Sequence, residues 1–146
     1  MRKIDMGMYT ELNMSVEIVA DASTIALLEY MVNDGADPGN VPDHPLFKRH
    51  GWQYCFDGCS FYFPHTEGSS LVNKSPWNEP ENPNAIERIL NIRCDLKDYH
   101  DEIKLLLDWL YPYIKTRGFV GYTRYEEDEH PTLIYITDRG VEYKNV

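Results

Sequence analysis

The sequence contains few cysteines, few basic residues and no long apolar run. Its 146 residues include three cysteines, and no apolar stretch approaches the ~20 residues that a membrane-spanning helix needs. The first residues lack an apolar core, so we expect no secretory signal peptide and interpret residues 1–8 as a leader segment. An odd number of cysteines without such a signal favours free thiols in a reducing cytoplasm.

Acidic residues outnumber basic ones by 24 to 14, which gives a net charge of −10 that is spread over the whole chain. A negative field repels nucleic-acid backbones and anionic membranes and attracts basic partners. We therefore expect no direct binding to nucleic acid or to a membrane. The 42% hydrophobic content excludes a disordered chain, and the length predicts a single domain over residues 1–146.

Periodicity predicts two strands and two helices. Apolar and polar residues alternate over residues 12–18 and 88–95, as in half-buried strands. Helical spacing predicts a first helix over residues 23–32, with Asp21 or Ser23 as its N-cap.

A second helix is predicted from residue 103 to 117. Pro112 should kink it or convert its last turn, and Gly118 is the expected C′ residue.

Two aromatic runs joined by Asp57-Gly58 predict a β-hairpin over residues 52–63, because Asp-Gly is a strong signal for a two-residue turn. The register of this hairpin places bulky side chains on one face, which needs helices packed on it. These side chains are Trp52, Tyr54, Phe56, Cys59, Phe61 and Phe63. Residues 119–125 and 132–137 predict a second hairpin, followed by a polar tail over residues 138–146.

These elements follow the order β-α-β-β-β-α-β-β. The order predicts an α+β fold, a two-layer sandwich with a mainly antiparallel sheet and two helices on one face, ferredoxin-like with an added C-terminal hairpin. Residues 64–86 are rich in Pro, Asn, Ser and Gly and are expected to form a long loop. Such loops in compact domains are usually functional or mobile.

Cys55 and Cys59, with His50 and His65 nearby, suggest a set of zinc ligands. The predicted hairpin directs the two thiols to opposite faces, whereas zinc ligands must converge on one point, so we expect no metal site. The histidines fall in loops or at element ends, and no catalytic or phosphate-binding motif accompanies them. We therefore expect no catalytic residues, no enzymatic activity and no cofactor.

Negative charge is densest at residues 126–129. The simpler interpretation is a solvated hairpin tip, whose acids discourage edge pairing. The alternative is a docking site in which carboxylates imitate a row of phosphates for a basic partner. The candidate partner-binding acids are Glu126, Glu127, Asp128, Glu129, Asp98, Asp101, Glu102 and Asp108.

Trp77 and Tyr62 are the aromatic candidates for a partner contact, because Trp and Tyr dominate binding hot spots. An alternative places Trp77 at the edge of the core. In a nucleotide-binding alternative, Trp77 or Tyr62 stacks on a base, while Arg88, Arg93 or Lys74 contacts a phosphate.

Several short segments, at residues 8–13, 42–47, 96–99, 121–127 and 131–135, resemble small acidic accessory proteins of bacteriophages and prophages. The resemblance spans most of residues 8–136 and carries no catalytic residue. It implies a viral protein in the cytoplasm of a bacterial host, where compact acidic proteins of this class often block restriction or CRISPR nucleases.

We therefore expect a protein-binding inhibitor that occupies a basic surface of a bacterial nucleic-acid-handling or defence protein. One alternative is a binder or sponge of a small nucleotide. Another is a phage structural or assembly protein, homo-oligomeric through a sheet edge.

Overall fold

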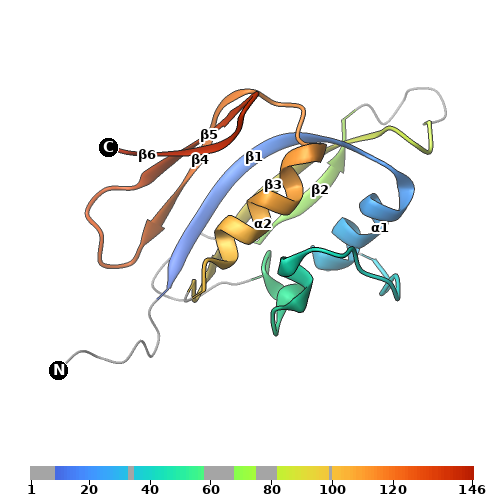
Figure 1. The fold of residues 1–146 in the computed structure, drawn as a ribbon, viewed down its shortest axis with the longest axis horizontal. Helices are drawn as coiled ribbons and strands as arrows, with labels where there is room; N and C mark the ends of the chain where they lie inside the picture. The colour runs from blue at the N-terminus through green and yellow to red at the C-terminus, as the bar shows by residue number, and fades with distance from the viewer. Residues whose placement is uncertain (1–8, 33–34, 58–67, 75–81, 99) are drawn as a thin grey trace.

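The computed structural model describes residues 9–32, 35–57, 68–74, 82–98 and 100–146. Within these ranges the chain has an α+β fold with a six-stranded antiparallel sheet and two α-helices (Figure 1). The strands are β1 (Thr10–Ala20), β2 (Ser70–Asn73), β3 (Ile86–Leu96), β4 (Gly118–Tyr125), β5 (Thr132–Thr137) and β6 (Gly140–Asn145). The helices are α1 (Ala22–Met31) and α2 (Glu102–Leu110), with the short 3-10 helices η1 (Pro45–Lys48), η2 (Trp52–Tyr54) and η3 (Tyr111–Tyr113).

The strand order in the sheet is β2-β3-β1-β4-β5-β6, and every neighbouring pair is antiparallel. Along the described chain the α-helices and strands follow the order β-α-β-β-α-β-β-β. The predicted order β-α-β-β-β-α-β-β is therefore wrong after α2, where three strands follow the helix instead of two; between the helices the described residues contain β2 and β3.

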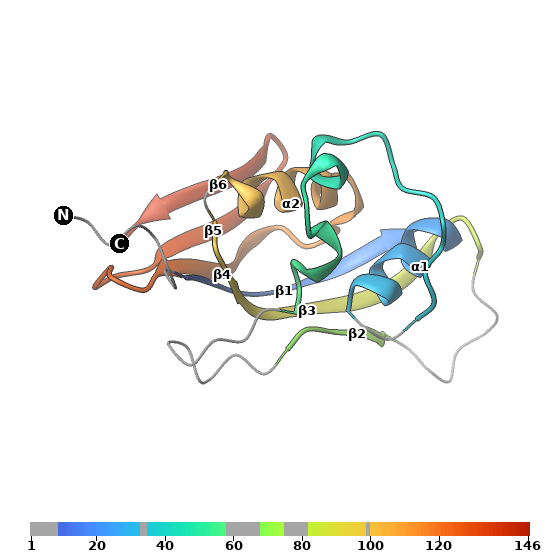
Figure 2. The same cartoon turned by 90° about the horizontal axis from the view of Figure 1, so that it is seen from below.

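The predicted alternation in β1 and β3 is confirmed. Leu12, Ile18 and Leu90 are fully buried, whereas Ser15 and Arg93 on the opposite face are exposed. Residues from both helices belong to the same core cluster as the buried residues of these strands. Figure 2 shows α1 and α2 on the same side of the sheet. One face of the sheet is thus covered by helices, and the other, which we call the open face, carries mainly polar side chains.

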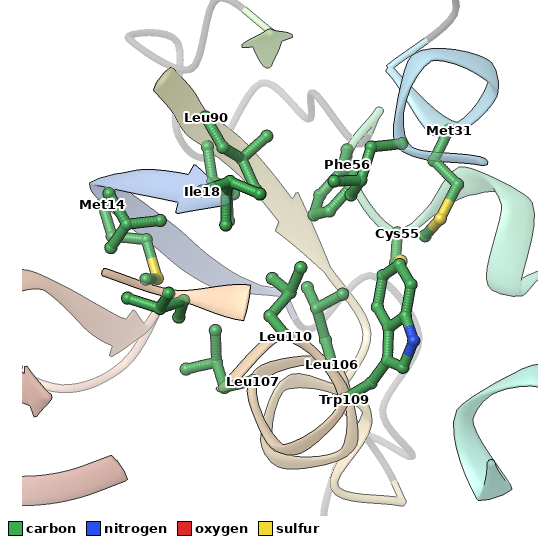
Figure 3. Close-up of a cluster of buried hydrophobic side chains, with 14 of the residues drawn as sticks. Met14, Ile18, Met31, Cys55, Phe56, Leu90, Leu106, Leu107, Trp109 and Leu110 are labelled. Atoms are coloured by element: carbon green, nitrogen blue, oxygen red, sulfur yellow. The ribbon is translucent and has the colours of Figure 1, made fainter. Parts of the chain in front are cut away.

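Residues 52–57 do not form the first strand of the predicted hairpin. Gly51 has a φ of +81°, a conformation that favours glycine, and the chain then enters η2 and a turn at residues 55–57. Cys55 and Phe56 are buried, and Figure 3 shows both pointing into the core beside Met31 of α1. The gain from burying these side chains against the helices exceeds the strand preference of the aromatic run. Residues 58–63 lie outside the described residues.

The second predicted helix is shorter than its apolar pattern. It ends at Leu110, and Pro112 converts the following turn into η3, as predicted. Gly118 is not a C′ residue; it begins β4 with a φ of +101°.

Two further segments differ from the sequence-based expectation. The predicted loop over residues 64–86 contributes β2, which pairs with β3. The predicted polar tail over residues 138–146 contains β6, because Val141 and Tyr143 are half-buried and pack against the core. The predicted strands of the C-terminal hairpin and Asp21 as the N-cap of α1 are confirmed.

Candidate functional site

The register of the sheet brings two groups of acidic residues to one end of the molecule. Thr10 at the start of β1 pairs with Leu96 at the end of β3 and with Tyr125 at the end of β4. The chain leaves the sheet here twice, once toward α2 and once into the turn between β4 and β5 (Figure 1). We call the acids of these segments the acidic end: Asp98, Asp101, Glu102, Glu126, Glu127, Asp128 and Glu129. The eighth predicted acid, Asp108, lies farther along α2.

Two acids of this group stabilise the start of α2. Asp98 Oδ1 accepts a hydrogen bond from the amide of Ile103 at 3.0 Å, a contact that an N-cap side chain normally makes. Glu102 Oε1 accepts from the amide of His100 at 2.8 Å, and its other oxygen lies 3.5 Å from the Arg49 guanidinium. Both carboxylates therefore already have partners within the fold.

Glu126 and Asp108 are also engaged. Glu126 accepts a hydrogen bond from the amide of Tyr9, and its own amide donates to the carbonyl of Tyr9. Asp108 lies 2.8 Å from His44 Nε2. Because Nδ1 of His44 accepts from the amide of Leu46 at 3.1 Å, Nε2 carries the proton that is donated to Asp108. This contact ties the segment before η1 to α2.

The other four predicted acids have no side-chain partner in the described part of the chain. Glu127, Asp128 and Glu129 are exposed in the turn between β4 and β5. Asp101 is exposed at the start of α2 and is the only described residue other than glycine with a positive φ, 61°. Aspartate tolerates this left-handed conformation better than most residues, but strained backbone is concentrated at functional sites. These four carboxylates are free to bind a partner without breaking an internal contact.

A groove of about 330 Å³ lies between α2 and the C-terminal strands, and its walls include Asp98, Lys104, Thr123 and Tyr143. Burial raises the pKa of Asp98 more than its backbone hydrogen bond lowers it. Burial also raises the pKa of Tyr143 to about 12, and the charges of Asp98 and Asp108 add to this effect. Lys104 Nζ lies 5.7 Å from the centre of the Tyr143 ring. The groove is thus lined by one acidic and one basic side chain, and its charges do not favour a ligand of either sign.

Two buried acids on the open face were not identified from the sequence. Glu11 and Asp95 lie opposite each other across β1 and β3 and are 7% and 1% exposed. Arg124 Nε lies 3.5 Å from Glu11, and the Tyr122 hydroxyl donates to Glu11 at 3.3 Å. The alternation of β1 assigned Glu11 to a wet face and gave no signal that it is covered.

The two described thiols pack in the core. Cys94 Sγ donates to the carbonyl of Cys55 at 3.2 Å, and burial raises the pKa of Cys55 to about 12 and that of Cys94 well above its ordinary value. Such thiols stay protonated and are poor nucleophiles and metal ligands. The described residues contain no group of three or more side chains able to hold a metal ion. The other two residues of the candidate zinc set, Cys59 and His65, lie outside the described residues.

The predicted aromatic contacts Trp77 and Tyr62 also lie outside the described residues. The structure instead exposes Phe119, which retains 57% of its accessible surface and packs edge-on against Tyr135 at 5.6 Å between ring centres. Among the predicted phosphate contacts, Lys74 is paired with Glu17 at 2.7 Å. Sequence reasoning placed Phe119 in a strand, but only the sheet register shows that it faces solvent.

Comparisons of the chain with protein-family models, curated proteins and solved structures find no match. Within the described ranges, no helix has the length and apolar character needed to cross a membrane.

Proposed function

We propose that this protein is a non-enzymatic binding module that occupies a basic surface of another protein through its acidic end. The observation that carries the proposal is the gathering of four exposed carboxylates at one end of the sheet, none of which has a side-chain partner among the described residues, namely Asp101, Glu127, Asp128 and Glu129. A partner can neutralise them without disturbing the fold, whereas Asp98, Glu102 and Glu126 would first lose internal contacts.

The partner class follows from the charge. Carboxylates clustered on a surface with a net charge of −10 speed the approach of a positively charged partner and compete with nucleic acid for the same basic groove. We therefore propose a bacterial nucleic-acid-handling protein, such as a restriction or CRISPR nuclease, as the target. The resemblance of the sequence to bacteriophage accessory proteins supports this choice, and it supports the bacterial cytoplasm as the place of action.

The test is capture of partners from bacterial lysate at low ionic strength, followed by association kinetics with the captured protein. Complexes that form through steered charges should dissociate at about 0.5 M salt, where the Debye length falls to a few ångströms. A test variant neutralises the four free acids with Asp101→Asn, Glu127→Gln, Asp128→Asn and Glu129→Gln.

A control variant removes the same number of charges elsewhere, with Glu29→Gln, Asp37→Asn, Asp43→Asn and Glu87→Gln. We expect the association rate constant of the test variant to fall about tenfold below that of the control variant. Equal association rates for the two variants, or a complex that is insensitive to salt, would contradict the proposal.

A structural or assembly role is a second candidate, favoured by the exposed Phe119 and by the unpaired outer edge of β6 in the described sheet. The nucleotide-binding alternative has no such support, since its aromatic candidates lie outside the described residues and Lys74 is already paired. Thermal unfolding with a panel of nucleotides tests it, because a ligand that binds the native state raises Tm.

We further propose that β1 to β4 with the two helices form a ferredoxin-like, two-layer unit. The order β2-β3-β1-β4 with alternating helices supports this assignment. In this arrangement β5 and β6 extend the sheet beyond β4, and the acidic end lies where that extension begins.

A further inference from the structure

The outer edge of β6 is unpaired in the described structure. The strand pairs with β5 along one side from Gly140 to Asn145, and it is the last strand of the sheet order. Backbone N–H and C=O groups along such an edge are a template for another strand. The opposite edge strand, β2, has four residues, so β6 presents the longer edge.

The register fixes which way the side chains of β6 point. Tyr143 pairs with Ile134, which is fully buried on the helix-covered face. Glu142 pairs with Tyr135 and Lys144 with Leu133, so Glu142 and Lys144 lie on the open face. Along the edge, Glu142, Tyr143 and Lys144 therefore present an acidic, an aromatic and a basic side chain in that order.

This order of charges is complementary to itself when the strand runs antiparallel. We propose that two copies of this chain associate through the outer edges of β6, paired antiparallel about a two-fold axis at Tyr143. The sheet then continues from one copy into the other, and residues directly opposite each other share a face. Glu142 of each copy lies opposite Lys144 of the other, and the two Tyr143 residues face each other on the helix-covered side.

The neighbouring registers are excluded by charge. A two-fold axis at Glu142 places Glu142 against its own copy, and an axis at Lys144 does the same for Lys144. Like charges directly opposite each other destabilise a strand pair, whereas opposite charges stabilise it. Shifting the pairing of the two β6 strands by one residue would place each side chain opposite one that points to the other face of the sheet.

Both charged side chains are already held in place by the neighbouring strand. Lys144 Nζ lies 4.6 Å from the centre of the Tyr135 ring, and Glu142 Oε2 accepts a hydrogen bond from the Thr137 hydroxyl at 3.2 Å. These two side chains therefore lose less conformational entropy when two copies associate. An unrelated strand would meet this charged edge without matching it, so a second copy is the occupant that the edge fits best.

Sedimentation velocity of the full chain tests the proposal at about 0.15 M salt, from about 10 µM to about 1 mM, a range that covers weak interfaces. We expect the weight-average mass to rise from monomer toward dimer. Two single variants, Glu142→Lys and Lys144→Glu, each create like-charge pairs in their own homodimer. The two-fold axis makes each like-charge pair occur twice in the dimer. The dissociation constant should therefore rise about tenfold for each variant alone.

Mixing the two single variants supplies the decisive measurement. In the mixed dimer the lysine introduced at position 142 of one copy faces the glutamate introduced at position 144 of the other. The native Lys144 of the first copy faces the native Glu142 of the second, so every pair is again of opposite charge and association should return to the wild-type level. The substitution Asp43→Lys makes the same change of net charge as Glu142→Lys away from the edge and should leave the dimer unchanged.

Thermal unfolding confirms that each variant folds. A wild-type chain that stays monomeric at the highest concentration overturns the proposal, as does a mixture that associates no better than its components. Neither result bears on partner binding at the acidic end, which is measured separately.

Discussion

Asp21 and Asp98 both accept a hydrogen bond from an amide in the first turn of a helix, but their pKa values move in opposite directions. Asp21 is exposed, and its hydrogen bonds with Thr24 lower its pKa. Asp98 lies in the groove beside α2, where burial outweighs the bond from Ile103 and raises its pKa. The same local contact favours the ionised form at both helices, but burial outweighs it at Asp98.

This difference predicts opposite dependences of stability on pH. The folded pKa of Asp98 is raised, so its stabilising contribution is fully present below the ordinary value of 3.8 and is lost as pH rises through the folded pKa. Asp98→Asn, which keeps an oxygen acceptor, should therefore be more stable than the wild type at pH 7, with the gain disappearing as pH falls to about 3.8.

For Asp21 the folded pKa is lowered, so its contribution is present above 3.8 and is lost as pH falls through the folded value. The matched variant Asp21→Asn should be less stable than the wild type at pH 7 and equal to it in acid. Urea unfolding midpoints between pH 3 and 7 measure both differences; parallel curves for the two variants would contradict the assignment.

The sequence could predict only one of these two caps. Asp21 lies directly before an apolar helical pattern, which is the usual place for an N-cap. Asp98 lies three residues before Asp101, and its contact with Ile103 spans the left-handed backbone of Asp101. No local spacing rule predicts that conformation.

At the scale of elements, Gly121 sets how closely β4 approaches β1. A side-chain Cβ built at this position would lie 2.1 Å from the carbonyl oxygen of Asn13 and 2.6 Å from the Cα of Met14. The approach occurs where β4 is irregular, with the extra residue Val120 between the pairs of Phe119 and Gly121 with β5. Val120 is buried as a result, and Phe119 is left exposed on the open face.

We predict that Gly121→Ala lowers the free energy of unfolding by about 3 kcal/mol, because two strand backbones must separate to admit the methyl group. Urea unfolding measures the loss. Gly39→Ala is the control: its φ of +83° is strained for alanine, but no atom lies within 4 Å of the new methyl group. Its cost should be about 1–2 kcal/mol. A smaller loss at Gly121 than at Gly39 would show that the strands yield easily.

The elements that the sequence could predict are those whose own pattern determines their packing. The alternating residues of β1 and the apolar stripe of α2 need only a partner surface. The aromatic run at residues 52–56 instead forms η2 and a turn, in which Cys55 and Phe56 are buried and Tyr54 is exposed, and its own pattern does not predict this. Residues 140–145 carry a strand signal of their own, since Val141 and Tyr143 alternate with two charged residues after a two-residue turn.

At the scale of the whole molecule, the acidic residues behind the net charge of −10 do not all affect stability in the same way. Acids such as Glu17 and Glu87 have basic neighbours and help to hold strands together. The free acids at the acidic end mainly repel one another and the rest of the chain. Composition predicts the surplus charge, but only the register of β1 with β3 and β4 shows where it gathers.

If the four free acids serve partner binding and not folding, their mutual repulsion should lower the thermal stability of the isolated protein. We predict that the test variant carrying Asp101→Asn, Glu127→Gln, Asp128→Asn and Glu129→Gln has a Tm about 1–2 °C above the wild type at low salt, because self-repulsion is relieved. The gain should vanish at about 0.5 M salt, where such repulsion is screened.

The control variant with Glu29→Gln, Asp37→Asn, Asp43→Asn and Glu87→Gln loses the same charge and the ion pairs of Asp43 with Lys48 and of Glu87 with Lys74. Its Tm should not rise as much, so differential scanning calorimetry of both variants at two salt concentrations separates local repulsion from net charge. A test variant less stable than the wild type would mean that these carboxylates support the fold, and the strongest reason for placing a partner there would be lost.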